Sequence, residues 1–372
     1  MGVANALVGL RAPGSEPGRP LVGHVVPEYL PRSATFIHTL LRNQRRFRPL
    51  VLAQSVANLD EFPVEQALAL GEDGFAGRLV EEARRGGCVL LHAHFGWSGR
   101  DAVPAERELN VPLVTTFYGR DLSEPGRARF RHPYRRLFSR GAAFVVEGPF
   151  MADRLAETGA ARDRIRVVPI GIDIGTLPFS TRARGDVFVA VQAARFVEKK
   201  GLDLSLRAFA AARRELGPSE LWLVGDGPLR DELEALAGAL GVSDAVRFPG
   251  LVAQDEYRRI AARADVALQP SRTASDGDSE GGAPTVILEY QALGIPVVAT
   301  RHADIPFVVP RPDELAPEDD VDALAGALVR VAAEDPDERV ERLQEARSFV
   351  ERRHDARQTA AMVEDVYEEV LQ

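Results

Sequence analysis

The chain has 372 residues, 45% of them hydrophobic, which is enough to bury the cores of two compact domains. Its formal net charge of −9 argues against a general nucleic-acid binder, because such a protein needs a basic surface, and an anionic small molecule would need a local basic pocket. The single cysteine, Cys88, excludes an internal disulfide and a cysteine-rich metal site.

The first twenty residues lack the basic start and the uninterrupted apolar segment of a secretory signal, and no later run is long enough to cross a bilayer. We therefore expect a cytoplasmic protein. Residues 42–48 and 126–140 combine arginines with aromatic side chains and contain no acidic residue. Peripheral contact with the inner face of the plasma membrane is a second expectation, and two solvated basic faces are the alternative.

Short apolar runs recur along the first half, mostly separated by segments long enough for a helix. They lie at residues 21–26, 49–54, 88–94, 112–118, 142–146 and 165–171. A break at residues 173–186, rich in glycine, proline, serine and threonine, precedes a second series. That series lies at residues 187–192, 221–227, 245–248, 265–270 and 295–300.

Continuously apolar strands that alternate with amphipathic helices predict parallel sheets with both faces covered. The predicted fold class is therefore α/β, with two doubly wound, Rossmann-like domains over residues 1–175 and 186–355. Residues 356–372 are expected to form a C-terminal helix that packs back towards the first domain. Ligands of such domains bind beyond the carboxyl ends of the strands.

Three cations follow the first strand of the second domain, ahead of a helix that begins near Leu202. They are Arg195, Lys199 and Lys200. An arginine fork grips two phosphate oxygens and a lysine adds a mobile positive charge, so Arg195 and Lys200 predict a diphosphate site. An ordinary charged loop is the alternative.

The next strand ends in the turn of residues 225–228, Gly-Asp-Gly-Pro, where Gly225 and Gly227 would let the backbone approach a ligand. Arg230 stands where a dinucleotide-binding fingerprint has its third glycine, which argues against a nicotinamide cofactor. We interpret Asp226 as a cap of the turn.

Residues 277–300 predict a short helix between a loop and a strand, with Pro284 in its first turn and Gly294 at its end. The free N–H groups at its start form an anion site. Glu289, one turn into the helix, suits the two hydroxyls of a ribose, and Glu280 on the preceding loop could meet a second sugar. The phosphate and nucleotide site is thus expected to contain Gly225, Gly227, Gly282, Ala283, Pro284, Thr285 and Glu289.

Together these motifs resemble the retaining, nucleotide-sugar-dependent glycosyltransferases of family 4, which have the GT-B fold of two facing Rossmann-like domains. The resemblance covers nearly the whole chain and is carried by RFVEKKG, LVGDGPLRDELE, VRFPG and SEGGAPTVILEYQALGIPVVAT. The looser matches SATFI, HAHFG and TTFYGRDL look most like the bacterial enzymes that build extracellular polysaccharides and lipopolysaccharides.

The resemblance implies transfer of a hexosyl group from a nucleoside-diphosphate sugar to a saccharide, lipid-linked or small-molecule acceptor, with retention of anomeric configuration. Arg195 and Lys200 would then stabilise the diphosphate, Glu289 would hold the ribose and Glu280 would meet the donor sugar, which makes Arg195, Lys200 and Glu280 the candidate catalytic residues. No cofactor and no essential divalent metal are expected. The sugar and acceptor cleft is expected to contain Ser33, Thr35, His94, Tyr118 and Asp121.

The chain departs from the family in placing eight residues, instead of seven, between Glu280 and Glu289. Tyr118 also stands where a histidine is common, and it can still form a hydrogen bond with a sugar. The open alternatives are a nucleotide-sugar epimerase, a non-catalytic nucleotide-sugar-binding protein and, less well matched to the cations, a glycoside hydrolase.

Two further patterns imitate metal sites. His92 and His94 would lie on one side of a strand, as in some zinc sites, but the sequence gives no evident third ligand, so we assign His94 to the cleft. Asp276 and Asp278 resemble an Asp-x-Asp metal motif, and we interpret them as a flexible acidic turn.

Overall fold

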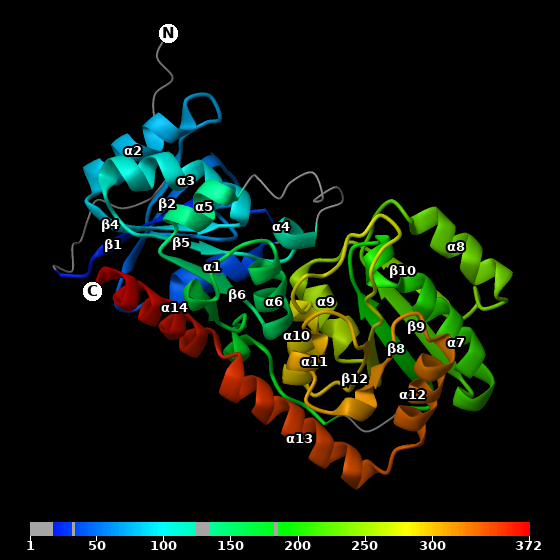
Figure 1. Cartoon of the computed structure of the whole chain (residues 1–372). Coiled ribbons are helices and arrows are strands. Elements are labelled where there is room, and N and C mark those ends of the chain that lie inside the picture. Colours follow the sequence, from blue (N-terminus) through cyan, green and yellow to red (C-terminus); the bar gives the residue numbers. More distant parts are fainter. Residues whose placement is uncertain (1–17, 32–33, 124–133, 182–184) are drawn as a thin grey trace. The chain divides into compact units, whose positions relative to one another are not determined.

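The computed structural model describes residues 18–31, 34–123, 134–181 and 185–372 (Figure 1). These residues form two compact units. The first comprises the chain up to residue 173 together with residues 353–372, and the second comprises residues 174–352. Helix α14 (Ala356–Leu371) therefore belongs to the first unit. None of the described helices is long and apolar enough to cross a bilayer.

The first unit is built on a seven-stranded parallel sheet in the order β3-β2-β1-β4-β5-β6-β7. Its strands are β1 (Leu21–Tyr29), β2 (Arg48–Val56), β3 (Ala67–Ala69), β4 (Cys88–His94), β5 (Leu113–Thr116), β6 (Ala143–Val146) and β7 (Ile165–Val167). Its other helices are α1 (Thr35–Asn43), α2 (Phe75–Gly86), α3 (Gly96–Leu109), α4 (Arg120–Ser123), α5 (Arg135–Arg140) and α6 (Pro149–Glu157). The strand order reverses at β1, the place where sheets of this kind bind ligands.

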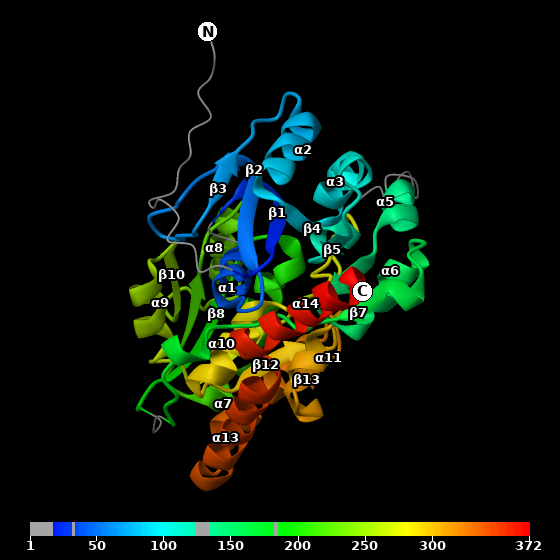
Figure 2. The ribbon, with the colours of Figure 1, turned by 90° about the vertical axis from the view of Figure 1, so that its left-hand side faces the viewer.

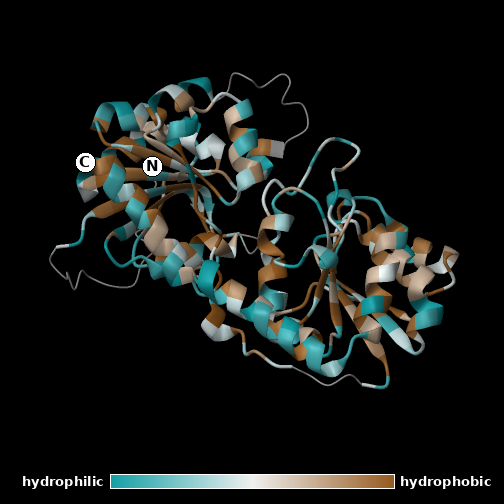
Figure 3. Cartoon of the chain, turned by 60° about the horizontal axis from the view of Figure 1, so that its bottom comes forward, coloured by the Kyte–Doolittle hydropathy of each residue, from teal (hydrophilic) through white to brown (hydrophobic). Residues whose placement is uncertain are grey.

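Helices cover both faces of the first sheet (Figure 2). Helices α2, α3 and α5 bury Leu79, Ala102 and Leu137 against one face, and α1 and α14 bury Ile37 and Tyr367 against the other. The strands are mostly hydrophobic, whereas hydrophilic residues gather on the helices (Figure 3). This is the covering that continuously apolar parallel strands require.

A buried carboxylate fastens α14 to the sheet. Oε1 of Glu364 accepts hydrogen bonds from the backbone N–H groups of Arg45, Arg46 and Phe47, at 2.8, 2.7 and 3.0 Å. Three charge-assisted bonds to one carboxylate hold it strongly. They fix the helix beside the start of β2 and so position Tyr367 in the core.

The second unit is built on a six-stranded parallel sheet in the order β10-β9-β8-β11-β12-β13. Its strands are β8 (Phe188–Ala193), β9 (Ser219–Val224), β10 (Val246–Gly250), β11 (Val266–Gln269), β12 (Val297–Thr300) and β13 (Leu315–Ala316). Its helices are α7 (Leu202–Leu216), α8 (Arg230–Ala239), α9 (Gln254–Ala261), α10 (Thr285–Leu293), α11 (Ile305–Val308), α12 (Val321–Ala333) and α13 (Pro336–Arg353). The predicted fold class, two doubly wound parallel units, is confirmed, and only the very short strands β3 and β13 were missed.

Candidate functional site

A partly buried ion pair lies where the strands of the second sheet end. Nζ of Lys200 is 2.7 Å from Oε2 of Glu280, and the two side chains are 18% and 7% exposed. Oε1 of Glu280 accepts a hydrogen bond of 2.7 Å from Oγ of Ser271. Burial raises the pKa of Glu280, but the charge of Lys200 and the bonds from Lys200 and Ser271 outweigh it, so the net pKa is lowered. Glu280 is therefore a carboxylate at neutral pH.

The three predicted cations have different surroundings. Lys199 is buried and binds Asp278 at 3.0 Å and the carbonyl of Ser279 at 2.9 Å. Arg195 is exposed, and within the described part of the chain its guanidinium has no hydrogen bond or ion pair. Lys199 is thus used to hold the loop, while Arg195 is available to a ligand.

The two glycines after β9 are explained by packing between loops. A Cβ at Gly225 would lie 1.9 Å from the carbonyl oxygen of Ala194, and one at Gly227 would lie 2.6 Å from that of Phe196. The N–H of Phe196 donates to the carbonyl of Asp226 at 2.8 Å. The turn therefore braces the segment that carries Arg195, and the predicted approach of its backbone to a ligand stays a prediction.

Helix α10 presents an uncapped N-terminus. Pro284 is its N-cap and not part of its first turn, because the helix begins at Thr285, and no side chain caps it. In the described residues, no acceptor binds the amides of Gly282, Ala283 and Thr285. Free N–H groups at a helix start attract anions. The hydroxyl of Tyr290 accepts a bond of 3.0 Å from the N–H of Ala193 and so anchors the helix at the end of β8.

The surroundings of Glu289 differ from those of Glu280. Burial on α10 raises its pKa, and this effect is partly offset by the hydroxyl of Tyr257 and the charge of Arg258. Gly281, directly after Glu280, has a φ of 76°, the left-handed region that favours glycine. The longer spacing between the glutamates thus contains a glycine turn. The structure brings Glu280 to Lys200 and gives Glu289 a separate environment.

Sequence reasoning missed His302, which follows β12. Its Nε2 accepts a bond of 3.2 Å from the backbone N–H of Glu280, so Nδ1 carries the proton and donates to Oε1 of Glu318 at 2.8 Å. Oε2 of Glu318 accepts from the N–H of Thr273 at 3.0 Å. His302 and Glu318 thus hold the loop of Glu280 at two points. Its place two residues after a predicted strand was the one signal for it.

The acidic turn is tied into the same loop. The backbone N–H of Asp278 donates to Oδ1 of Asp276 at 2.8 Å, and the side chain of Asp278 pairs with Lys199. Asp278 is thus already neutralised by a lysine. The turn that the sequence predicted is present, but these contacts hold it in place, whereas a flexible turn was expected.

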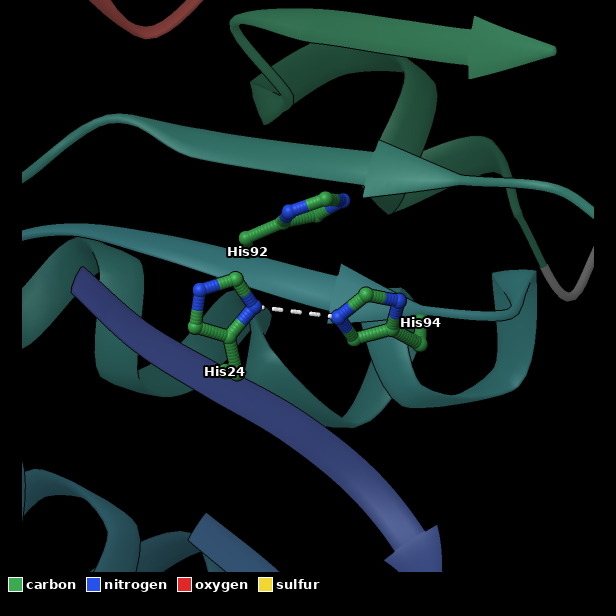
Figure 4. A group of neighbouring side chains, drawn as sticks. All are labelled: His24, His92 and His94. Carbon is green, nitrogen blue, oxygen red and sulfur yellow. Dashed lines mark hydrogen bonds between the residues drawn. The ribbon is translucent and has the colours of Figure 1, made fainter. Parts of the chain in front are cut away.

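The first unit contains three neighbouring histidines, shown in Figure 4. His24 on β1 is opposite His92 on β4 in the sheet register, and His94 lies two residues further along β4. All three side chains are fully buried. One ring nitrogen of each lies within 4.8 Å of the others, so a third potential metal ligand exists, contrary to the expectation from the sequence. The third ligand is His24, which the parallel pairing of β1 with β4 brings beside His92. A local sequence pattern does not show this pairing.

A small pocket opens beside this cluster, at the carboxyl ends of β5, β6 and β7. Tyr118, Thr116 and Glu147 provide polar groups on its wall. Its remaining lining is mostly apolar and comes from α1, β6, α14 and the segment after β7: Phe36, Leu40, Val145, Val168, Pro169, Ile170 and Val363. His94 itself is buried and reaches the pocket only through Tyr118, whose hydroxyl is 2.7 Å from its Nδ1.

The other residues expected in the acceptor cleft have varied surroundings. Asp121 is buried and accepts bonds from the N–H groups of Gly96, at 2.7 Å, and Tyr118, at 3.1 Å, so it holds these turns together. Thr35 is exposed at the start of α1. Ser33 lies outside the described residues.

The two arginine-rich segments are less basic than their sequences suggest. Arg46 pairs with Glu364, Asp365 and Glu368 of α14, at 3.4, 2.6 and 3.0 Å. Residues 126–133 of the second segment lie outside the described residues, and at its end Arg140 pairs with Glu106 at 2.7 Å. Acidic residues distant in sequence therefore neutralise part of the charge proposed to meet a membrane.

Two family models match the chain, one in each unit. That of Glycosyl transferases group 1 matches residues 187–334, and that of Glycosyltransferase Family 4 matches residues 60–176. A D-inositol 3-phosphate glycosyltransferase of Saccharomonospora viridis is 31% identical over 315 residues, which are 76% of this chain and 70% of that protein. The putative colanic acid biosynthesis glycosyltransferase WcaL of Escherichia coli is 34% identical over 273 residues, 72% of this chain and 66% of its own length.

This chain thus spans about two thirds of the length of WcaL. Among solved structures, Anabaena HepE in complex with UDP-glucose has a TM-score of 0.78 at 18% identity, covering 94% of this chain and 99% of that one. At this identity the likeness concerns the fold.

Proposed function

Because the chain belongs to the glycosyltransferases of group 1 and family 4, we propose that it transfers a sugar from a nucleoside-diphosphate sugar to a hydroxyl group of a saccharide or lipid-linked acceptor. The observation that carries this proposal is the grouping of Lys200, Glu280 and the uncapped start of α10 around the strand ends of one sheet. The relatives named for colanic acid biosynthesis favour bacterial polysaccharide synthesis as the setting.

The proposed chemistry follows from where charge develops. Breaking the bond between the sugar and the phosphate leaves negative charge on the diphosphate and positive charge on the anomeric carbon. Arg195, Lys200 and the amides of Gly282, Ala283 and Thr285 would stabilise the diphosphate. The carboxylate of Glu280 would face the sugar. Because these cations and N–H groups are already fixed in place, they need not reorient as negative charge develops in the transition state.

Glu280 and Lys200 are proposed to act as one unit. In the free site the carboxylate of Glu280 already compensates the ammonium of Lys200. A bound diphosphate would form a second ion pair with the ammonium of Lys200, and the carboxylate of Glu280 would keep that ammonium oriented. The remaining lone pairs of the carboxylate would accept hydrogen bonds from sugar hydroxyls. Ser271 would hold the carboxylate in place during this exchange.

Retention of configuration and independence from metal ions are further proposals. We assign the carboxylate of Glu280 to Lys200 and to sugar hydroxyls, not to attack on the anomeric carbon, and propose that the acceptor hydroxyl loses its proton to the departing phosphate. Turnover in excess EDTA tests the second point: unchanged turnover supports it, and loss of activity that manganese restores would make Asp276 and Asp278 candidate ligands.

The experiment that tests the function is release of nucleoside diphosphate from a panel of UDP- and GDP-linked sugars, with and without saccharide and lipid-linked acceptors. Acceptor-dependent release supports transfer. Conversion of the donor into an epimer without an acceptor would instead indicate an epimerase, and tight binding with no release would indicate a sensor. Sedimentation with anionic vesicles at rising salt tests a location at the inner face of the plasma membrane, because electrostatic binding weakens with salt.

A further inference from the structure

Two buried glutamines lie at the carboxyl ends of adjacent strands of the second sheet. Gln192 is the last residue but one of β8, and Gln269 ends β11, which pairs with β8. Neither side chain is exposed to solvent. Burying an amide is unfavourable unless hydrogen bonds replace its contacts with water. Each amide forms such bonds, and each is linked to one member of the ion pair of Lys200 and Glu280.

Gln192 holds the backbone of Lys200. Its Nε2 donates to the carbonyl oxygen of Lys200 at 2.7 Å, and its Oε1 accepts from Oγ of Ser205, on α7, at 2.7 Å. A carbonyl oxygen can only accept, so the amide must turn its NH2 group towards Lys200. Turned over, it would place two acceptor oxygens against each other. Both ends of the amide are therefore fixed, and with them the point from which the side chain of Lys200 starts.

Gln269 holds Glu280 through Ser271. Nε2 of Gln269 donates to Oγ of Ser271 at 2.8 Å, and this Oγ donates to Oε1 of Glu280 at 2.7 Å. The hydroxyl has a single proton, and a carboxylate paired with Lys200 can only accept, so that proton is donated to Glu280. Ser271 must therefore accept from its other neighbour, which requires the NH2 group of Gln269.

The carboxylate of Glu280 decides the direction of these two bonds. The other end of the Gln269 amide, Oε1, is buried and has no hydrogen bond within the described residues, so it favours neither orientation. If the amide were turned over, its oxygen would face Oγ of Ser271, and the one proton of Ser271 would have to serve both Gln269 and Glu280. One of the two close oxygen pairs would then lack a proton, which is costly between buried groups.

The backbone of Ser271 is held as well. Oγ1 of Thr300, at the end of β12, donates to the carbonyl of Ser271. The N–H of Ser271 donates to the carbonyl of Gln269 at 2.9 Å, and the side chain of Ser271 is fully buried. The hydroxyl therefore has one position and one direction of donation.

We propose that Gln192 and Gln269 are positioning residues of the donor site. Gln192 holds Lys200 for the diphosphate, and Gln269, through Ser271, holds the carboxylate of Glu280 for the sugar. The inference rests on the proposed function in naming the diphosphate and the sugar as the groups that are bound. The alternative is that the two amides only fasten neighbouring segments to the sheet and have no effect on a ligand.

The two links have different consequences for binding. Lys200 is proposed to meet the diphosphate, which a nucleoside diphosphate and the whole donor share. Glu280 is proposed to meet the sugar, which only the whole donor carries. Loss of the Gln192 amide should therefore weaken the binding of both ligands, and loss of the Gln269 amide should weaken only that of the donor. A general loss of stability would not separate the two ligands.

Titration calorimetry of the full chain with UDP, GDP, UDP-glucose and GDP-mannose tests this difference. Gln192→Met and Gln269→Met are matched variants, because methionine keeps an unbranched side chain of similar length without the amide donor. We expect Gln192→Met to weaken both kinds of ligand roughly fivefold, the worth of one hydrogen bond, and Gln269→Met to weaken only the nucleotide sugar by that factor. Equal losses on both ligands in Gln269→Met, or no loss in either variant, would overturn the inference.

Ser271→Ala tests the route from Gln269 to Glu280. In a protein that already carries Ser271→Ala, Gln269→Met should cost no further affinity for the nucleotide sugar, whereas Gln192→Met should cost as much as it does alone. A full additional loss in the double variant of Gln269 and Ser271 would exclude this route. Thermal unfolding establishes that each variant is folded, and Gln192→Leu or Gln269→Leu takes the place of a methionine variant that is not.

Crystal structures of the folded variants decide the inference without any ligand. Gln269→Met should displace the carboxylate of Glu280 and leave the carbonyl of Lys200 in place, and Gln192→Met should do the reverse. Unchanged positions of both groups would overturn the inference. If the wild-type protein transfers no sugar from any donor, the proposed function fails, and these structures still decide whether the glutamines hold the ion pair. If transfer occurs but both groups keep their positions, only the inference fails.

Discussion

The ammonium of Lys200 lies 2.7 Å from the carboxylate of Glu280, so the cation proposed to bind the donor diphosphate is paired with a carboxylate of the protein. Glu280→Gln removes the competing charge and leaves Lys200 to the phosphate. We expect unchanged or tighter binding of a nucleoside diphosphate, together with weaker binding or slower turnover of the whole donor, because the sugar loses its carboxylate. Titration calorimetry with both ligands measures this, and equal losses on both would place Glu280 away from the sugar.

Glu289→Gln is the matched control, since it makes the same change on α10. An amide accepts less strongly than a carboxylate at the ribose, and losing one charge-assisted bond costs about 1.5–3 kcal/mol. Nucleoside diphosphate binding should therefore weaken roughly tenfold to a hundredfold. Unaltered affinity for the nucleoside diphosphate would remove Glu289 from the nucleotide site.

Arg195 is exposed and has no partner in the described residues, so its replacement should not disturb the fold. Arg195→Ala is expected to lower kcat/KM at least tenfold through the loss of a diphosphate contact. Arg207 is an exposed arginine on the surface of α7, so Arg207→Ala is the control and should leave kcat/KM unchanged. Similar rates in the two variants would exclude Arg195 from the site.

His302 holds the backbone of Glu280, so His302→Ala should displace that loop. We expect kcat to fall roughly tenfold to a hundredfold, because small displacements at a reacting centre are costly. His302→Gln can still accept the bond from the N–H of Glu280 and should recover much of kcat. Thermal unfolding of both variants separates a local displacement from loss of fold. A fully active His302→Ala would show that the loop does not depend on this bond.

The buried histidines make stability depend on pH with a definite sign. The pKa values of His24 and His354 are lowered to about 3 and about 4, and those of His92 and His94 are well below the ordinary value. Below pH 6.5 these histidines become protonated in the unfolded state but stay neutral in the folded state. The free energy of unfolding should therefore fall by about 1.4 kcal/mol per pH unit for each histidine.

This loss should begin near pH 6.5 and continue towards pH 3, with no contribution from these groups above pH 7. Urea unfolding at pH 8, 7, 6 and 5 measures it. His94→Asn removes one titrating ring and should make the slope shallower. An equal free energy of unfolding at pH 7.5 and pH 5.5 would contradict the burial of neutral rings.

Features set by local sequence were predictable. Helix α7 begins at Leu202, as its pattern indicated, and Gly294 ends α10 with a φ of 81°. The cations after β8 and the loop carrying Glu280 were found because each directly adjoins a strand or a helix. Two doubly wound units followed from the alternation of apolar strands with amphipathic helices.

Contacts between distant segments were not predictable. His24 and His94 are 70 residues apart and meet only through parallel strand pairing, and His302 reaches Glu280 across 22 residues. The sequence pattern indicates that glycines are needed after β9, but not that their missing Cβ atoms allow one loop to pack on another. A sequence shows that glycine is required but not which neighbour requires it.

The most direct test of the central claim is the rate of nucleoside diphosphate release from UDP- and GDP-sugars by the wild-type protein and by Lys200→Ala, with an acceptor present. Circular dichroism first establishes that both are folded, since Lys200→Ala leaves the carboxylate of Glu280 without its counter-charge. We predict acceptor-dependent release by the wild type and a rate lower by orders of magnitude in the variant. Equal rates in the two proteins, or no release from any donor, would contradict the account.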